Sequence, residues 1–358
     1  MFTYILRRIM SSIPVLFGIL AVTFIIARAI PGDPCRAMLG EKATQAICDE
    51  FIHRHGLDKP ILTQFAIYVG EIARGDFGES LRYGKPVTEL MIERLPTTLE
   101  LTFVAMAFST ILGIPLGIIS AVRQNSSIDI GTMLVANIGI SMPVFWLGLM
   151  LAYVFALLLK GTPFQLPPSG RLTAGMSPDP FYVVWGLKVT SEGLLSLFDF
   201  ISRLNMVNAI LIWRWDVFWD AVKHIILPAI AVGTIPLALI ARMTRSSMLD
   251  VLGTDYLRTA RAKGVSRYSQ VMHHALRNAL LPLVTIIGLS LGTFLGGAVL
   301  TETIFGLSGV GRILYESITA RDYIIVQSFT VVIAIFFVVL NLIVDISYIY
   351  LDPRVRLD

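Results

Sequence analysis

The stretch DYLRTARAKG, residues 255–264, followed by HALRNALLP at 274–282, decides how this sequence is interpreted. Both lie in a water-compatible segment, 242–278, between two apolar runs. The pattern of 255–264 predicts a short helix that ends at Gly264, and a second helical pattern follows it. A polar segment between two apolar runs must face water. We therefore expect a short helix that protrudes from a membrane protein and docks on an aqueous partner.

Composition places the chain in a lipid bilayer. Apolar residues make up 55% of the 358 residues and charged residues only 15%, unlike a soluble globular protein. Most of the charge-free runs approach or exceed the roughly 20 residues that a helix needs to cross the hydrocarbon core. Scattered Gly and Pro favour packed helices over barrel strands. We expect an all-α integral membrane protein with six transmembrane helices, at 9–27, 101–122, 130–159, 225–241, 279–301 and 323–344.

Basic residues predict the orientation in the membrane. Segment 242–278 holds seven basic and two acidic residues, and such loops stay on the cytoplasmic side. Six spans then place both termini in the cytoplasm. The first apolar run is too long for a secretory signal and is followed by Pro31-Gly32-Asp33-Pro34 instead of a cleavage site. Residues 1–30 are therefore expected to form the N-terminus and first span.

Segment 181–213 is apolar enough to be considered as a seventh span. It contains Lys188, Glu192, Asp199 and Arg203, which are costly in lipid, and a seventh pass would move the basic loop outside. We interpret the segment as an amphipathic region on the outer surface.

The domain organisation follows from these spans. We expect an external cap at 31–96, then a core at 97–358 with five spans, a second external segment at 160–223 and the cytoplasmic loop 242–278. The two cysteines, Cys35 and Cys48, both lie in the cap. An oxidising compartment predicts a disulfide between them, although two small buried thiols are the alternative.

Glycine and proline within the spans predict packing and bends. Close helix contacts are expected at the four-residue spacings Gly113, Gly117 and Gly288, Gly292, Gly296. Kinks are expected at Pro115, Pro143, Pro228 and Pro236.

The segment quoted at the outset closely resembles the cytoplasmic signature loop of membrane permease subunits in bacterial ATP-binding-cassette importers, in the dipeptide and oligopeptide branch. The wider family has Glu-Ala-Ala, three residues and Gly, whereas here Arg258 and Thr259 stand at the first two positions, and Ala260 and Gly264 match. The remaining segments that look like this branch are Ile5-Leu6-Arg7-Arg8, Pro31-Gly32-Asp33-Pro34, Gly56-Leu57-Asp58-Lys59-Pro60, Gly75-Asp76-Phe77-Gly78, Leu95-Pro96-Thr97-Thr98-Leu99-Glu100-Leu101, Glu302-Thr303-Ile304-Phe305 and Arg321-Asp322-Tyr323.

The resemblance implies the type I importer permease fold with external helical elaborations, and a helix that couples the permease to an ATPase. Small side chains let this helix approach a partner groove, and its basic side chains complement an acidic rim. A basic loop held by anionic lipid is the alternative. The expected coupling residues are Asp255, Tyr256, Arg258, Thr259, Ala260, Arg261, Ala262, Lys263 and Gly264.

The energy source is expected to lie outside this chain. The six apolar runs contain no Asp, Glu, Lys or His, which argues against ion coupling. The chain also lacks a G-x-x-x-x-G-K-[ST] phosphate loop. By the resemblance, ATP and Mg bind to two separate ATP-binding subunits and this chain holds no cofactor. An ATP-independent channel is the more distant alternative.

Motifs for catalysis are missing from the sequence. The five histidines form no H-E-x-x-H zinc site, and no G-x-S-x-G nucleophile elbow is present. We expect neither an enzyme nor a metal site. Polar residues at membrane depth that could line a translocation path are Asn137, Ser141 and Asn341, with interhelical hydrogen bonding as the alternative.

The resemblance also implies the remaining partners and the cargo. It implies a second homologous permease subunit, an external solute-binding protein and membrane lipid as partners, in the bacterial cytoplasmic (inner) membrane, and no nucleic acid. Di- or oligopeptides are the expected cargo. Nickel chelates, glutathione or oligosaccharides are the alternatives.

Overall fold

The structure is a computed structural model that describes residues 2–29, 43–54, 58–80, 82–296, 298–320 and 322–351. Long helices dominate it: α1 (Phe2–Ala29), α5 (Val87–Val122), α6 (Ser127–Ser141), α11 (Trp215–Leu252), α14 (Leu276–Leu295) and α17 (Tyr323–Leu351). Between them lie α3 (Gln45–Arg54), α4 (Ile61–Ala73), α7 (Val144–Ala152), the π-helical turn η1 (Tyr153–Leu158), α8 (Phe181–Val184), α9 (Glu192–Ser202) and α10 (Asn205–Leu211). The remaining helices are α12 (Asp255–Ala262), α13 (Arg267–Ser269), the π-helical turn η2 (Gln270–Ala275), α15 (Val299–Ile304) and α16 (Val310–Thr319).

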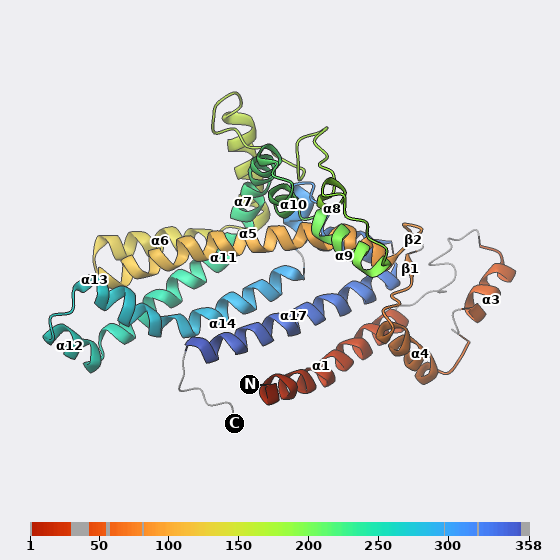
Figure 1. Cartoon of the computed structure of the whole chain (residues 1–358), viewed down its shortest axis with the longest axis horizontal. Helices are drawn as coiled ribbons and strands as arrows, with labels where there is room; N and C mark the ends of the chain where they lie inside the picture. Colours follow the sequence, from red (N-terminus) through yellow and green to blue (C-terminus); the bar gives the residue numbers. More distant parts are fainter. Residues whose placement is uncertain are drawn as a thin grey trace.

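The long helices run side by side along the long axis of the molecule (Figure 1). Helix α11 packs against α5, α6 and α14, and α17 packs against α14 and α1. Helices α12 and α13 stand at one end, and the short antiparallel hairpin β1 (Glu79–Ser80) and β2 (Lys85–Pro86) stands at the other, with α4. We call these the coupling end and the hairpin end.

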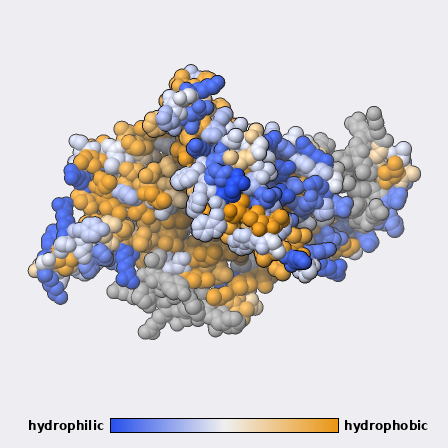
Figure 2. All heavy atoms as spheres, turned by 45° about the horizontal axis from the view of Figure 1, so that its top comes forward, coloured by the Kyte–Doolittle hydropathy of each residue, from blue (hydrophilic) through white to orange (hydrophobic). Residues whose placement is uncertain are grey.

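Five helices are long and apolar enough to cross a membrane, and two bent helix pairs raise the number to as many as seven. The α6–η1 pair at 127–158 corresponds to the expected span 130–159, so the six expected spans all find a counterpart. The chain is thus a mostly helical membrane protein. Apolar side chains gather over the middle of the molecule, and hydrophilic ones lie at the coupling end (Figure 2).

The third expected span is not a straight helix. It breaks at Met142 and Pro143, where the two halves meet at 101°. Pro143 is the N-cap residue of α7. Proline has no backbone N–H, and at this position no helical hydrogen bond is lost as a result. Pro115, Pro228 and Pro236 lie inside helices that continue through them. Only one of the four expected kinks is therefore a break.

Several helices extend beyond the apolar runs that predicted them. Helix α11 continues through Leu252, and α13, η2 and α14 form one continuous helical stretch, Arg267–Leu295, so the expected loop 242–278 consists largely of helix ends on either side of α12. Helix α14 stops at Leu295, before the expected end of that span at 301, and α15 follows as a separate element. Ionisable residues just outside the apolar runs, such as Glu100 and Asp129, consequently lie within the long helices. An apolar run marks only the part of a helix that faces lipid, so the helix boundaries differ from the ends of the runs that predicted them.

Glycines bring the central helices into backbone contact. A Cβ at Gly117 of α5 would lie 2.5 Å from the carbonyl oxygen of Ala241 on α11. Gly288 and Gly292 of α14 lie against the side chains of Val344 and Phe337 of α17. These contacts agree with the expected close packing at Gly117, Gly288 and Gly292. At Gly296 the expectation was wrong, since a Cβ there would meet only the Thr293 carbonyl of the same helix.

The external cap is described in part. Cys48 of α3 is buried, whereas Cys35 lies outside the described residues, so the disulfide between them stays a prediction. The hairpin is held by Asp322, whose carboxylate accepts a 2.7 Å hydrogen bond from Ser80. The Phe77 carbonyl accepts another, of 3.0 Å, from Ser328 of α17.

The segment 160–223, expected to be external, contains α8, α9 and α10. Helices α9 and α10 meet at 101°, so 192–211 is not one straight helix. The ring of Phe181 lies 5.3 Å from that of Phe198, and the Asn208 side chain accepts a 2.9 Å hydrogen bond from the Phe181 N–H. The three helices thus form one packed unit, and α9 contacts α5.

Candidate functional site

Helix α12 protrudes from the coupling end between α11 and α13 (Figure 1). The sequence predicted a helix over 255–264, and the structure has it at Asp255–Ala262 with Lys263 as C-cap. Gly264 has φ +77°, a left-handed conformation that glycine adopts without strain. The chain can therefore turn sharply out of the helix, as the sequence predicted.

One buried side chain holds α12 on the bundle. Leu257 is 2% exposed and belongs to a cluster with Met248 of α11, Ala121 of α5, and Ala275 and Ala279. Burying a leucine contributes about 2 kcal/mol. Helix α12 packs mainly against η2, and through this cluster it is linked to the two central helices, α5 and α11.

Polar contacts fix the other side of α12. The Tyr256 hydroxyl donates a 2.6 Å hydrogen bond to the His274 carbonyl and accepts one of 2.9 Å from Asn278. After the helix, the Val265 N–H donates to the Ala260 carbonyl at 3.2 Å, and Gln270 donates to the Val265 carbonyl at 2.6 Å. The turn 263–266 is therefore tied at both ends.

Most of the expected coupling residues point to solvent. Asp255, Tyr256, Arg258, Thr259, Arg261, Ala262, Lys263 and Gly264 are exposed, and Ala260 is half-buried against the Leu257 cluster. Arg258 pairs with Asp255 at 3.0 Å, but both side chains are mostly exposed, so this pair adds little stability. The exposed face of α12 carries three cations and one carboxylate.

About two turns before the end of α11 lies a partly buried ion pair that sequence reasoning missed. Arg245 of α11 donates two hydrogen bonds of 2.8 Å each to the carboxylate of Asp129 on α6. Ser120 of α5 also donates to Asp129, and so does the Asn125 N–H, at 2.9 Å. The signal in the sequence was a single acidic residue at the start of an apolar run.

Two of the three expected path residues lie together. Ser141 donates a 3.1 Å hydrogen bond to the Asn137 carbonyl, and the Asn137 side chain accepts one of 3.0 Å from Arg242. Both are exposed on α6. Asn341 lies on α17, which packs against α14 and α1 on the other side of the bundle (Figure 1). The chain by itself does not bring Asn341 to the other two.

Two segments that carried the resemblance meet near the hairpin end. Thr98 of α5 donates a 2.7 Å hydrogen bond to the carboxylate of Glu302, which also accepts one of 2.9 Å from the Arg312 N–H. Glu302 is fully buried, and burial raises its pKa, against the lowering effect of these hydrogen bonds. A Cβ at Gly309 would collide with the carboxylate. These residues fix the start of α16 on α5.

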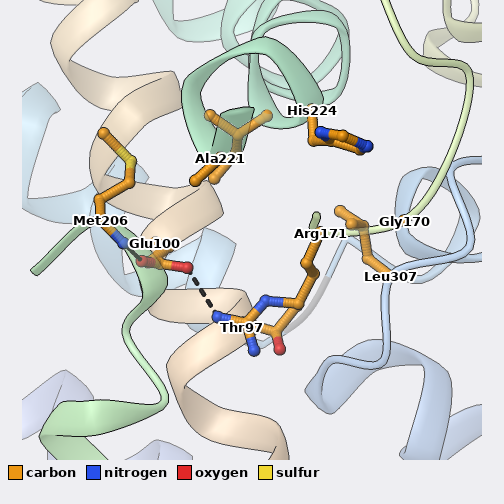
Figure 3. Close-up of a pocket in the computed structure, with 9 residues that line it drawn as sticks. Thr97, Glu100, Gly170, Arg171, Met206, Ala221, His224 and Leu307 are labelled. Carbon is orange, nitrogen blue, oxygen red and sulfur yellow. Dashed lines mark hydrogen bonds and ion pairs between the residues drawn. The ribbon is translucent and has the colours of Figure 1, made fainter. Parts of the chain in front are cut away.

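A small pocket lies where residues 170–171 and α10 meet α5 and α11 (Figure 3). Its polar lining includes Glu100, Arg171 and His224, and Arg171 donates a 2.7 Å hydrogen bond to Glu100. The cavity volume is about 10 Å³, which is room for about one water molecule. This pocket is too small for a peptide, so it is a joint between elements instead of a cargo site.

The described residues contain no group of three or more His, Cys, Asp or Glu side chains that could hold a metal ion. Glu100 and Asp129, the carboxylates in the long helices discussed above, are both paired with arginines.

Family models account for almost the whole chain. Residues 113–357 match the binding-protein-dependent transport system inner membrane component, and residues 1–102 match the N-terminal model of the same kind of protein. The sequence identified this family, and the match confirms it, together with the expected permease fold and multi-pass inner-membrane character. A transport component moves solute instead of transforming it, in agreement with the expectation that the chain is not an enzyme.

Curated relatives match over their full length. The chain is 44% identical over 356 residues to the dipeptide transport system permease protein of Alkalihalophilus pseudofirmus, covering 99% of this chain and 100% of that protein. It is 42% identical over 359 residues to that of Escherichia coli, covering 99% of each. It is 39% identical over 357 residues to an oligopeptide transport system permease protein of Bacillus subtilis, covering 99% of this chain and 100% of the relative. The chain therefore belongs to the family of binding-protein-dependent transport system inner membrane components.

Proposed function

We infer that this chain is one of two permease subunits of an ATP-driven importer of di- or oligopeptides. In this proposal, movement of the ATPase subunits is transmitted to the permease through α12. The observation that carries this is the exposed basic face of α12, whose Leu257 shares one buried apolar cluster with residues of α5 and α11. A partner that pushes on this face pushes on the two central helices of the bundle. The family match and the names of the relatives support the peptide cargo.

The arrangement in the membrane follows from α12. Its ATPase partner works in the cytoplasm, so the coupling end and both termini lie inside, and ATP and Mg are bound by the two partner subunits. The cap 31–96 and the segment 160–223 then face outward, where an external binding protein delivers peptide. Asn137 and Ser141 are exposed on α6, where they would line a passage between this chain and a second, homologous permease subunit.

Charge reversal on α12 tests the coupling. The importer is reconstituted in proteoliposomes with its ATPases, second permease and binding protein, and uptake of a labelled dipeptide is measured with ATP inside. Arg261→Glu and Gly264→Asp are expected to abolish uptake and release the ATPase subunits, while the chain remains inserted. Lys188→Glu, the same reversal in the exposed part of the external segment, is the matched control and should transport normally.

Retained uptake and ATPase subunits in both variants would count against the docking role. Uptake that survives ATP depletion and persists in Gly264→Pro would point to an ATP-independent channel. Competition against the labelled dipeptide identifies the cargo class: unlabelled di- and tripeptides should compete, and stronger competition by a nickel chelate, glutathione or an oligosaccharide would replace the peptide assignment.

A further inference from the structure

Glu100 of α5 holds two separate parts of the external segment. Its side chain is 8% exposed, and its carboxylate accepts a 2.7 Å hydrogen bond from the Arg171 guanidinium and another of 2.7 Å from the Met206 N–H. Arg171 precedes α8, and Met206 lies in the first turn of α10 (Figure 3). The same Arg171 nitrogen donates to the Arg203 carbonyl at the end of α9, at 2.5 Å. We call this set of contacts the Glu100 clamp.

The segment held by the clamp is tied together internally. The Asn208 side chain accepts from the Phe181 N–H at 2.9 Å and donates to the Asp179 carbonyl at 3.1 Å. Tyr182 donates to Asp199 at 2.6 Å. Because these bonds join α8, α9 and α10, a force on any of the three helices reaches the clamp.

Contacts run without a gap from the clamp to α12. A Cβ at Gly233 of α11 would lie 2.9 Å from the Ala105 carbonyl of α5, close to one turn beyond Glu100. Further along, Gly117 touches Ala241 in the same way. At the coupling end of α5, Ala121 shares a cluster with Leu257 of α12. Packed elements of this kind transmit displacement, since interiors are close-packed.

The charge of the clamp suits it to this task. A buried carboxylate that loses its guanidinium partner is left uncompensated, so the paired arrangement is strongly preferred over a loose one. Other links between the segment and the bundle are uncharged or less buried: the Gly170 N–H donates to the Phe305 carbonyl at 2.9 Å, and Thr173 donates to Asp220 at 2.7 Å.

We propose that Glu100 and Arg171 are the positioning residues through which a binding protein, arriving at the external segment, accelerates the ATPases beneath α12. The proposal rests on the proposed function. The clamp sets how much the ATPase is stimulated, and the outer surface of the segment sets how tightly the binding protein docks.

ATPase stimulation in the complete importer, reconstituted in lipid nanodiscs, tests the proposal. With peptide-loaded binding protein at saturation, Glu100→Gln and Arg171→Gln should each lower the maximal stimulation by about fivefold or more, the range of typical coupling energies. Basal ATPase and the binding-protein concentration at half-maximal stimulation should stay within about twofold. The double variant should lower the maximal stimulation no further than either single variant, since both substitutions break the same Glu100–Arg171 contact.

Asp216→Asn is the matched control, because it breaks the exposed Arg214–Asp216 pair of 2.6 Å, which lies in the external segment but outside the clamp. It should leave stimulation unchanged. Full stimulation in both clamp variants would overturn the proposal, and so would a rise in the half-maximal concentration with unchanged maximal stimulation. Loss of assembly in both variants would assign the clamp to folding alone and overturn it as well. If the wild-type importer showed neither ATPase stimulation nor peptide uptake, the proposed function itself would be contradicted.

Discussion

Arg245 of α11 donates two parallel hydrogen bonds of 2.8 Å each to the carboxylate of Asp129 on α6. Only 5% of the Asp129 side chain is exposed, and Ser120 of α5 donates to the same carboxylate. One acidic group thus joins three helices about two turns before α11 ends and α12 begins.

Arg245→Met is expected to destabilise the protein by about 3 kcal/mol, because it leaves a buried carboxylate unpaired. The double variant Asp129→Leu/Arg245→Met should lose less, since the charge is then gone. The midpoint of denaturant unfolding in detergent micelles measures both. Arg258→Met, in the exposed pair with Asp255, serves as control and should change the stability by less than about 1 kcal/mol. Equal losses of stability from Arg245→Met and Arg258→Met would contradict the larger contribution expected of the Arg245–Asp129 pair.

Gly117→Val should prevent the close approach of α5 and α11. The new Cβ would lie 2.5 Å from both the Ala241 carbonyl and the Thr244 Cβ, and such overpacking costs about 1–3 kcal/mol. A lower temperature of aggregation, followed by size-exclusion chromatography after heating, is the expected result. Gly131→Ala on α6 meets nothing within 4 Å and should be neutral or slightly stabilising. Unchanged heat resistance in Gly117→Val would contradict the tight contact.

The contact between the hairpin and α16 should weaken in acid. Burial acts to raise the pKa of Glu316, but hydrogen bonds from Tyr83 and Arg312 and the charges of Arg312 and Arg82 lower the pKa overall. A carboxyl group with a lowered pKa stabilises the folded state above its ordinary pKa of 4.5, and this stabilisation is lost as the pH falls through the lower, folded-state value.

Hydrogen exchange detects this loss at the Gly84 N–H, which donates to the Ser80 carbonyl within the hairpin. Its protection, corrected for intrinsic exchange, should fall between about pH 5 and about pH 3 in the wild type and less steeply in Glu316→Gln. Identical pH profiles for the two proteins would refute the role of Glu316. Other carboxylates remain in both proteins, so the difference between the profiles reports Glu316 alone.

Labelling of single cysteines should place the coupling end inside the cell. In a Cys35→Ser/Cys48→Ser background that still transports, Lys263→Cys should react with a membrane-impermeant maleimide only after right-side-out vesicles are permeabilised. Lys188→Cys, exposed in the external segment, should react in sealed vesicles and provides the control. Reaction of Lys263→Cys in sealed vesicles would invert the proposed topology.

The sequence predicted the long helices and α12 because their signals are local. Apolar runs mark the spans, and Gly264 marks the exit from α12 at the residue where φ becomes positive. The break at Pro143 was not distinguishable from Pro115, Pro228 and Pro236, since a proline in a span predicts a kink but not its size. The outcome depends on what packs around each proline.

The polar contacts of the site were beyond sequence reasoning. Glu100 and Arg171 are 71 residues apart, and Thr98 and Glu302 are 204 apart. A single sequence carries no information on which distant residues meet. Glu100 also falls one residue before the apolar run at 101, where it looked like the edge of a span, whereas the helix that contains it begins at Val87.

The length of α11 has a mechanical consequence. Its 38 residues form a rod about 57 Å long, nearly twice the thickness of the hydrocarbon core. A tilt of about 10° about the middle of this rod, where Gly233 packs against α5, would move each of its ends by about 5 Å, close to one helical turn. Under the proposed function, a small movement at the coupling end would therefore shift the opposite end of α11 without a large rearrangement within the membrane.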